Sequence, residues 1–191
     1  MAVNFDPLTH DAAQVYEQQE QQQDLENALE YTGRIYDSGR DMRDQYCRGD
    51  YNDACVSAEQ LTENSLNAIA ELNGGLPNEY RNHTTLAKRK EAYCPDLPIT
   101  NDSLKNMEEA YKNRYPHPKT KKIQHQYSKE ETKEMIKDAC EAGDYALNSL
   151  DIPYEERFNQ FGKPSKIEDI DSLKMYNLLF NGSTNEVTYQ L

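Results

Sequence analysis

Apolar residues recur every three or four positions along most of this chain, and its prolines fall outside these stretches. Such spacing places the apolar residues on one face of a helix, and no stretch has the pattern of a sheet-forming core. The first stretch runs from Asp11 to Tyr46 and includes Leu25 and Leu29. Its start is glutamine-rich and polar on every side, so we expect it to fray in solvent, the alternative being an assembly contact.

The helices predicted after this first one are separated by recognisable stop and start signals. Asp50 is expected to cap the second helix, and Asn73-Gly74-Gly75 reads as a helix stop rather than a phosphate loop. Ser128-Lys129-Glu130-Glu131 has the form of a capping box. The predicted helices cover 51–72, 84–93, a segment that opens at Asp102 or Ser103, turns Tyr111 inward and ends before Pro116, and a segment from Ser128 to about Leu150.

These elements favour an all-α fold, namely an antiparallel bundle of four to five helices. Pro153 is predicted to close the compact part. We therefore expect a polar helical extension over 1–24, the bundle over 25–150 and a C-terminal extension over 151–191. Within the last extension, Leu173, Tyr176, Leu179 and Phe180 suggest one more helix, and Val187, Tyr189 and Leu191 alternate like a short strand.

Composition narrows the class of protein. No run approaches the ~18 apolar residues of a membrane span, and Met1–His10 lacks the features of a signal peptide, so we expect a soluble, cytoplasmic protein. The four cysteines form no C-x-x-C pair, which argues against a structural zinc site and for reduced thiols, with Cys55 and Cys140 on apolar helix faces. No metal and no cofactor is predicted.

Charge is distributed unevenly along the chain. The stretches 81–90 and 112–125 contain no acid and together carry +9, so the remainder carries −22 within a net charge of −13. A long duplex laid across this surface would be repelled outside the two stretches, and duplex DNA is therefore disfavoured as a partner. A small phosphate-bearing ligand or a short single strand held between the stretches is compatible with this pattern.

Several of these motifs, taken in order, resemble the HEPN domain over about residues 49–150. The matching pattern comprises Tyr51-x-x-Ala54-x-x-x-Ala58-Glu59-x-x-x-Glu63, Gly74-Gly75-x-Pro77, His83, Tyr111-x-x-Arg114-Tyr115-Pro116 and Tyr127-Ser128. The resemblance implies a helical bundle, frequently a homodimer, that is often encoded beside a minimal nucleotidyltransferase. Members include ribonuclease toxins, defence factors and proteins that bind nucleotides or only partner proteins.

The ribonucleases of this family carry an arginine followed, after four to six residues, by a histidine. This chain departs from that pattern, because two residues separate Arg114 from His117 and ten separate Arg114 from His125. Some family toxins are silenced by nucleotide transfer onto a tyrosine two residues after the histidine. His125-Gln126-Tyr127 has that local form, which we interpret as coincidence.

The first functional hypothesis is therefore binding of a nucleotide, RNA or protein partner, in a toxin–antitoxin, defence or anti-defence setting. The predicted ligand-binding residues are Arg81, Lys88, Tyr111, Arg114, Tyr115, Lys119, Lys121 and Lys122. A structural role is open for two of them, since Arg114 can contact the last carbonyls of its helix and Tyr115-Pro116 can simply end it.

Two alternatives come from different classes. The first is a divergent, metal-independent endoribonuclease that uses Arg114, His117 and His83, in which a histidine moves the 2′-hydroxyl proton and the arginine stabilises charge on the phosphate. The second is an acidic interaction protein that inhibits a nucleic-acid enzyme. Separately, Glu59 and Glu63 share a helix face, and we expect both to be exposed, because burial would raise the pKa of each.

Overall fold

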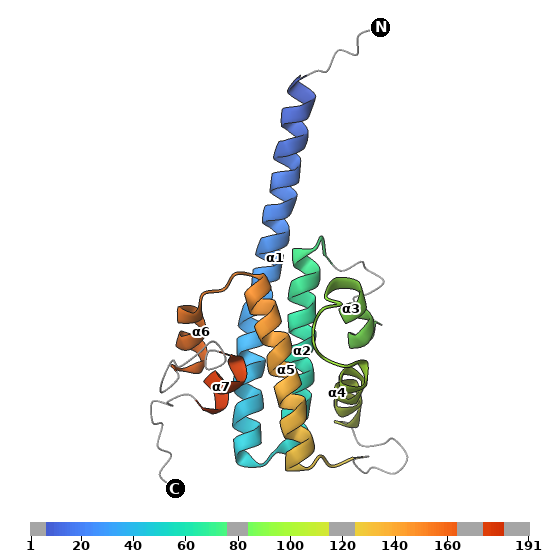
Figure 1. Ribbon diagram of the computed structural model, residues 1–191, viewed down its shortest axis with the longest axis vertical. Helices are drawn as coiled ribbons and strands as arrows, with labels where there is room; N and C mark the ends of the chain where they lie inside the picture. The colour runs from blue at the N-terminus through green and yellow to red at the C-terminus, as the bar shows by residue number, and fades with distance from the viewer. Residues whose placement is uncertain (1–6, 76–83, 115–124, 164–173, 182–191) are drawn as a thin grey trace.

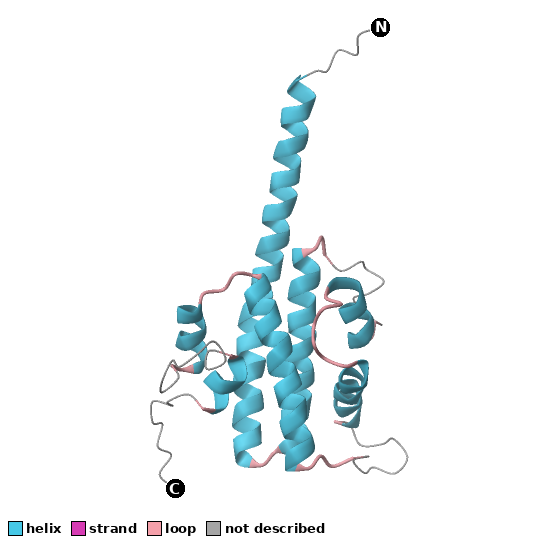
Figure 2. Cartoon of the chain, viewed as in Figure 1, coloured by secondary structure: helices cyan, strands magenta, loops and turns pink. Residues whose placement is uncertain are grey.

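The computed structural model describes residues 7–75, 84–114, 125–163 and 174–181, and in these ranges it contains helices and no strand (Figure 2). The all-α prediction is confirmed. The helices are α1 (Pro7–Arg48), α2 (Tyr51–Leu72), α3 (Leu86–Tyr93), α4 (Asn101–Asn113), α5 (Lys129–Ser149), α6 (Tyr154–Phe161) and α7 (Met175–Phe180). None of the helices in these ranges is long and apolar enough to span a membrane.

Three long helices form the centre of the bundle. The lower half of α1 packs along α2, and α2 packs along α5, while α3 and α4 lie on one side and α6 and α7 on the other (Figure 1). Each long helix buries an apolar face at helical spacing, as the sequence predicted. Fully or almost fully buried residues include Ile35, Met42, Leu61, Leu66, Ile136, Ala139 and Leu147.

Most helix boundaries follow the predicted signals. The helix predicted over 84–93 begins instead at Leu86, because the Thr85 side chain takes the N-cap position. Gly74 and Gly75 have φ of +94° and +85°, which confirms the helix stop after α2. The fourth helix does not open at Asp102 or Ser103. It begins at Asn101, because the Thr100 side chain accepts a hydrogen bond from the Ser103 backbone N–H and so takes the cap position. Asp50 occupies the predicted N-cap position of α2, but its side chain makes no capping hydrogen bond.

The first helix extends well beyond the rest of the bundle (Figure 1). The expected fraying of its polar start is not what the structure shows, because helix is continuous from Pro7. Leu25 and Leu29, expected on the buried face, are 40% and 37% exposed. Burial begins at Ala28 and Ile35, where α2 covers the helix. Only the part of α1 beside a partner helix therefore has a buried face.

The core continues past Pro153, where the sequence indicated its end. The eight-residue α6 was not predicted, since only Arg157 and Phe161 are buried in it and one of the two is charged. Phe161 meets Tyr36 edge to face at 5.2 Å, and α7 buries Met175, Leu178 and Leu179. The prediction of a last helix is confirmed by α7, whereas Leu173 and the strand suggested at 187–191 lie outside the described residues.

The described cysteines contribute to packing. Cys55, Cys94 and Cys140 are buried, Cys47 is exposed, and all four are free thiols. Cys55 and Cys140 lie on apolar helix faces, as predicted. Burial raises the pKa of Cys55 to about 11, so this side chain stays a protonated thiol at neutral pH.

Candidate ligand cleft between α4 and α5

An open cleft of about 830 Å³ lies between α4, which lines it from Ser103 to Asn113, and the first half of α5. Its walls come from these two helices and from the short segment that leads into α5. The described residues that line it are Ser103, Asn106, Glu109, Lys112, Asn113, His125, Tyr127, Glu131, Glu134, Met135 and Asp138.

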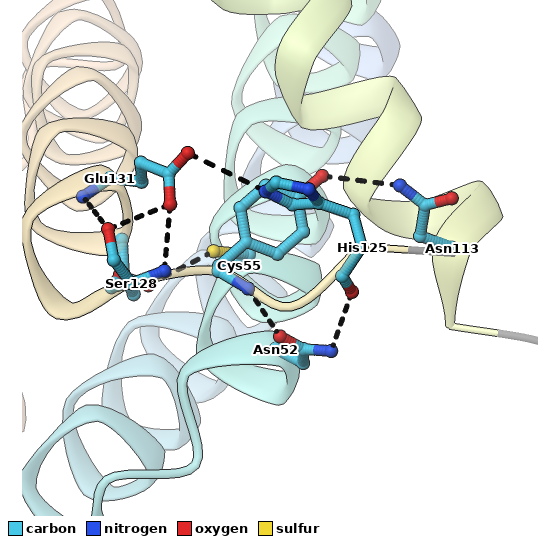
Figure 3. A network of polar contacts seen from close by, with 8 residues as sticks. Asn52, Cys55, Asn113, His125, Ser128 and Glu131 are labelled. Carbon is cyan, nitrogen blue, oxygen red and sulfur yellow. Dashed lines mark hydrogen bonds and ion pairs between the residues drawn. The ribbon is translucent and has the colours of Figure 1, made fainter. Parts of the chain in front are cut away.

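The segment entering α5 is held in place by a single amide side chain on α2. The Asn52 Nδ2 donates to the carbonyl oxygen of His125 at 3.2 Å, and the Tyr127 backbone N–H donates to Asn52 Oδ1 at 2.9 Å (Figure 3). Both ends of the amide are thus used on one short stretch of backbone. Asn52 therefore determines how the His125 and Tyr127 side chains enter the cleft.

The rings of His125 and Tyr127 lie against each other at the cleft wall. Their centroids are 4.5 Å apart and their planes are inclined at 74°, an edge-to-face arrangement. The Asn113 amide of α4 donates to the Tyr127 hydroxyl oxygen at 3.5 Å, which links the two walls. Burial raises the pKa of Tyr127, an effect that this hydrogen bond partly opposes, so the phenol remains protonated at neutral pH.

Glu131 connects the helix start to the histidine. Its Oε2 accepts from the Ser128 backbone N–H at 2.8 Å, and the Glu131 N–H donates to Ser128 Oγ at 3.2 Å, which confirms the predicted capping box. Its Oε1 faces His125 Nε2 at 3.5 Å (Figure 3). The hydrogen bonds from Ser128 lower the pKa of Glu131, so this carboxylate is ionised at neutral pH.

The charged side chains that line the cleft are mostly acidic, with a cation at one end. Four of its described lining residues are carboxylates, namely Glu109, Glu131, Glu134 and Asp138, whereas Lys112 is the one lysine among them. Lys112 lies in the last turn of α4 and is followed by Arg114 at the helix C-cap. A ligand with few negative charges can therefore enter with its anionic part at the α4 end, while a long polyanion would meet the carboxylates.

The predicted ligand-binding residues are divided by the structure. Lys88 is exposed in the first turn of α3, and Tyr111 and Arg114 are exposed at the end of α4. None of these three lines the cleft; the two residues between Tyr111 and Arg114 do so instead. Tyr111 was expected to face inward, but it is 40% exposed, which corrects that placement. The remaining predicted site residues, Arg81, His83, Tyr115, His117, Lys119, Lys121 and Lys122, lie outside the described residues.

Part of the first cationic stretch is used by the fold itself. Arg89 is buried, and its guanidinium donates to Glu63 Oε1 and Asn67 Oδ1, both at 2.8 Å. Lys90 donates to the carbonyl oxygen of Ile99 at 2.5 Å. These two cations hold α3 against α2 and against the segment before α4. They are therefore not placed to attract a ligand from solvent.

The expected exposure of Glu59 is wrong. Its side chain is buried beside Glu63 and Glu108, and one of its carboxylate oxygens has no hydrogen-bond partner. Burial, reinforced by the two neighbouring carboxylates, raises the pKa of Glu59 to about 8. The glutamate packs into the interface that also holds Arg89, which periodicity alone could not reveal.

Sequence reasoning passed over the residues that the structure gathers at the cleft. The sequence does not mark His125-Gln126-Tyr127 as a site, because no arginine stands at the family spacing before it. Asn52 and Asn113 belong to no motif, and only contact across 75 residues of sequence reveals the role of Asn52. The capping box was a usable signal, since it placed Tyr127 directly before a helix start.

The all-α helical bundle agrees with the comparison against protein families. A family model described as HEPN domain matches residues 37–147, more than half of the 191-residue chain. The chain belongs to the HEPN domain family. The comparisons with curated proteins and with solved structures gave no match.

Proposed function

We propose that this HEPN protein binds a nucleotide or the end of a short single-stranded RNA in the cleft between α4 and α5. The observation that carries the proposal is the His125–Tyr127 ring pair, which Asn52 fixes at the wall of an open polar cleft. Membership of the HEPN family supports a nucleotide- or RNA-related role.

The chemistry of the lining residues suits the parts of a nucleotide. Aromatic rings offer a stacking surface for a base, and such stacking contributes about 1–3 kcal/mol per base. The carboxylates and amides that line the cleft can accept hydrogen bonds from base edges and ribose hydroxyls, and the amides can also donate hydrogen bonds to them. At the C-terminal end of α4, Lys112 lines the cleft and provides positive charge for a phosphate group.

The charges also limit the ligand. Each additional phosphate that entered the cleft beyond Lys112 would approach Glu109, Glu134 or Asp138. Repulsion between like charges opposes this approach, and salt weakens it. A mononucleotide or a strand end is thus favoured over a duplex, which agrees with the excess of acid elsewhere on the chain.

Titration calorimetry with nucleoside monophosphates, nucleoside triphosphates and short RNAs tests the proposal. Tyr127→Ala and Lys112→Ala should each weaken binding about tenfold, since one removes a stacking surface and the other a phosphate contact. Lys133→Ala is the matched control, because this lysine is exposed on α5 and does not line the cleft. Binding that is absent, or equal in all three variants and the wild type, would contradict the proposal.

A metal-independent ribonuclease is the second candidate, favoured by the 3.5 Å approach of His125 Nε2 to Glu131 Oε1. A histidine oriented by a carboxylate can take the 2′-hydroxyl proton while an arginine such as Arg114 stabilises the phosphate. The 2′-oxygen then attacks phosphorus to form a 2′,3′-cyclic phosphate, the bond to the 5′-oxygen breaks, and the 5′-oxygen takes a proton from the protonated histidine or from water. Cleavage of RNA in EDTA should be lost in His125→Ala; retention there but loss in His117→Ala or His83→Ala would return the role to the residues first predicted.

The assembly and biological setting implied by the family are further proposals. Homodimerisation is tested by sedimentation equilibrium of the full chain. A minimal nucleotidyltransferase or another cognate protein in the adjacent reading frame would support a toxin–antitoxin role, and viral or defence genes there would support the inhibitor hypothesis.

A further inference from the structure

The upper part of α1 carries large apolar side chains that stay exposed in the described chain. Val15, Leu25 and Leu29 are 51%, 40% and 37% exposed, and among the residues whose side-chain exposure is described they are three of the four large exposed hydrophobic residues. At 3.6 residues per turn, the three lie within about 80° of the helix circumference. Gln18 and Gln22 fall within the same arc. These five residues form a stripe, here named the α1 stripe.

This part of α1 is helical without support from the bundle. Residues 17–23 are all exposed, and the helix rises clear of α2 and α5 (Figure 1). Helices in proteins are stabilised mainly by packing of their apolar face. A helix that presents such a face suits the helix-in-groove mode of recognition.

Charge decides what can cover the stripe. Between Gln14 and Gly33 the chain contains no lysine or arginine and five acids, which are Glu17, Glu20, Asp24, Glu26 and Glu30. Glu26 and Glu30 are exposed and follow Leu25 and Leu29 directly along the helix. A second copy of α1 laid on the stripe would bring ten carboxylates together with no compensating cation from this segment, which opposes pairing.

We infer that the α1 stripe is a docking surface for a basic protein partner, whose apolar groove receives Val15, Leu25 and Leu29 and whose rim presents lysines or arginines to Glu26 and Glu30. The apolar residues supply affinity by leaving water. The acids supply orientation and a fast, salt-sensitive association. This surface lies on a different part of the molecule from the α4–α5 cleft, and the inference does not depend on the proposed function.

A defined probe tests the inference on the full chain. The probe is a labelled synthetic helical peptide of about four heptads with leucine at positions a and d and lysine at e and g, and its counterpart carries glutamate at e and g. Fluorescence anisotropy should show binding of the basic peptide, weakening as salt rises, and no binding of the acidic peptide.

The decisive variant is Leu25→Gln with Leu29→Gln, which keeps helix propensity and net charge while removing the apolar contacts. We expect it to weaken binding of the basic peptide by about tenfold or more. Gln23→Ala, exposed on the same helix but outside the stripe, should leave binding unchanged. Circular dichroism verifies that each variant retains its helix.

Three results would overturn the inference. The first is failure of the wild-type chain to bind the basic peptide. The second is equal binding by the wild type and the double variant, which would reduce the attraction to net charge alone. The third is a doubled mass in sedimentation equilibrium that the double variant abolishes, because a second copy would then occupy the stripe.

Discussion

The side chain of Met175 lies directly over Gly143, so that a Cβ at position 143 would be 2.6 Å from the Met175 Cε and 2.8 Å from its Sδ. Both carboxylate oxygens of the next residue, Asp144, lie 3.0 Å from the Met175 backbone nitrogen. The missing side chain and the carboxylate together form a seat for α7 on α5. The C-terminal helix is thereby joined to the centre of the bundle.

Gly143→Ala should destabilise the protein by up to about 2 kcal/mol net, since the added methyl displaces the buried Met175 side chain at a cost of about 1–3 kcal/mol, which the higher helix propensity of alanine offsets by about 0.5–1 kcal/mol. Gly33→Ala is the control. Gly33 is also helical but has no atom within 4 Å of an added Cβ, so alanine there should stabilise by about 0.5–1 kcal/mol. Urea unfolding of both variants gives the comparison. Equal shifts in the same direction would show that α7 does not sit on Gly143.

Glu59 makes stability depend on pH. Its pKa of about 8 in the folded protein exceeds the usual 4.5, so the folded state holds a proton that the unfolded state has lost. The stabilisation that comes from this extra bound proton is fully present below about pH 4.5 and is lost as pH rises through about 8. Glu59→Gln cannot ionise and should be more stable than wild type at pH 9 by about 2–4 kcal/mol, with little difference near pH 4.

Thermal unfolding of Glu59→Gln and wild type at pH 4, 6, 8 and 9 measures this difference. Glu155→Gln, on an exposed position of α6, removes the same charge without the burial and should run parallel to the wild type. If the stability of the wild type relative to Glu59→Gln does not fall as pH rises, the charge of the ionised Glu59 must be stabilised by other groups in the folded state.

Asn52→Ala removes both hydrogen bonds that hold the segment before α5. Each is worth about 1 kcal/mol net, so we expect about 1–3 kcal/mol of destabilisation. Faster hydrogen exchange at the Tyr127 amide should accompany this loss, because that N–H donates to Asn52 Oδ1. Asn52→Asp retains this acceptor but loses the donor to His125, and should therefore protect the Tyr127 amide more than alanine does. Unchanged exchange of the Tyr127 amide in Asn52→Ala would show that Asn52 does not hold the segment before α5 in place.

Ser128→Ala breaks the capping box of α5 and should reduce stability by about 1 kcal/mol. It should also weaken ligand binding, because Glu131 is held by Ser128 and faces His125. Thr85→Ala removes the side-chain cap of α3, whose residues do not line the cleft. A similar loss of stability with intact binding is expected there. Equal effects of Ser128→Ala and Thr85→Ala on binding would show that the capping box of α5 does not help to position the binding site.

The sequence predicted local features well because their causes are local. The capping box at Ser128 and the stop at Gly74 and Gly75 need only a few neighbouring residues. The fate of Leu25 was predicted wrongly, since periodicity shows that a face is apolar without showing where the neighbouring helix ends. The sequence did not predict α6, because one of its two buried residues, Arg157, is charged. In the structure Arg157 is buried beside Asp144 and forms part of the core.

By itself, the sequence determined the helical class, most helix limits and the membership of the HEPN family, because side-chain spacing and capping act within one or two turns. Only the tertiary structure decided that Asn52 positions His125 and Tyr127, that Glu59 is buried, and that α7 seats on Gly143. Those relationships join residues far apart in the chain, and the free energy that selects them comes from packing and desolvation between whole helices.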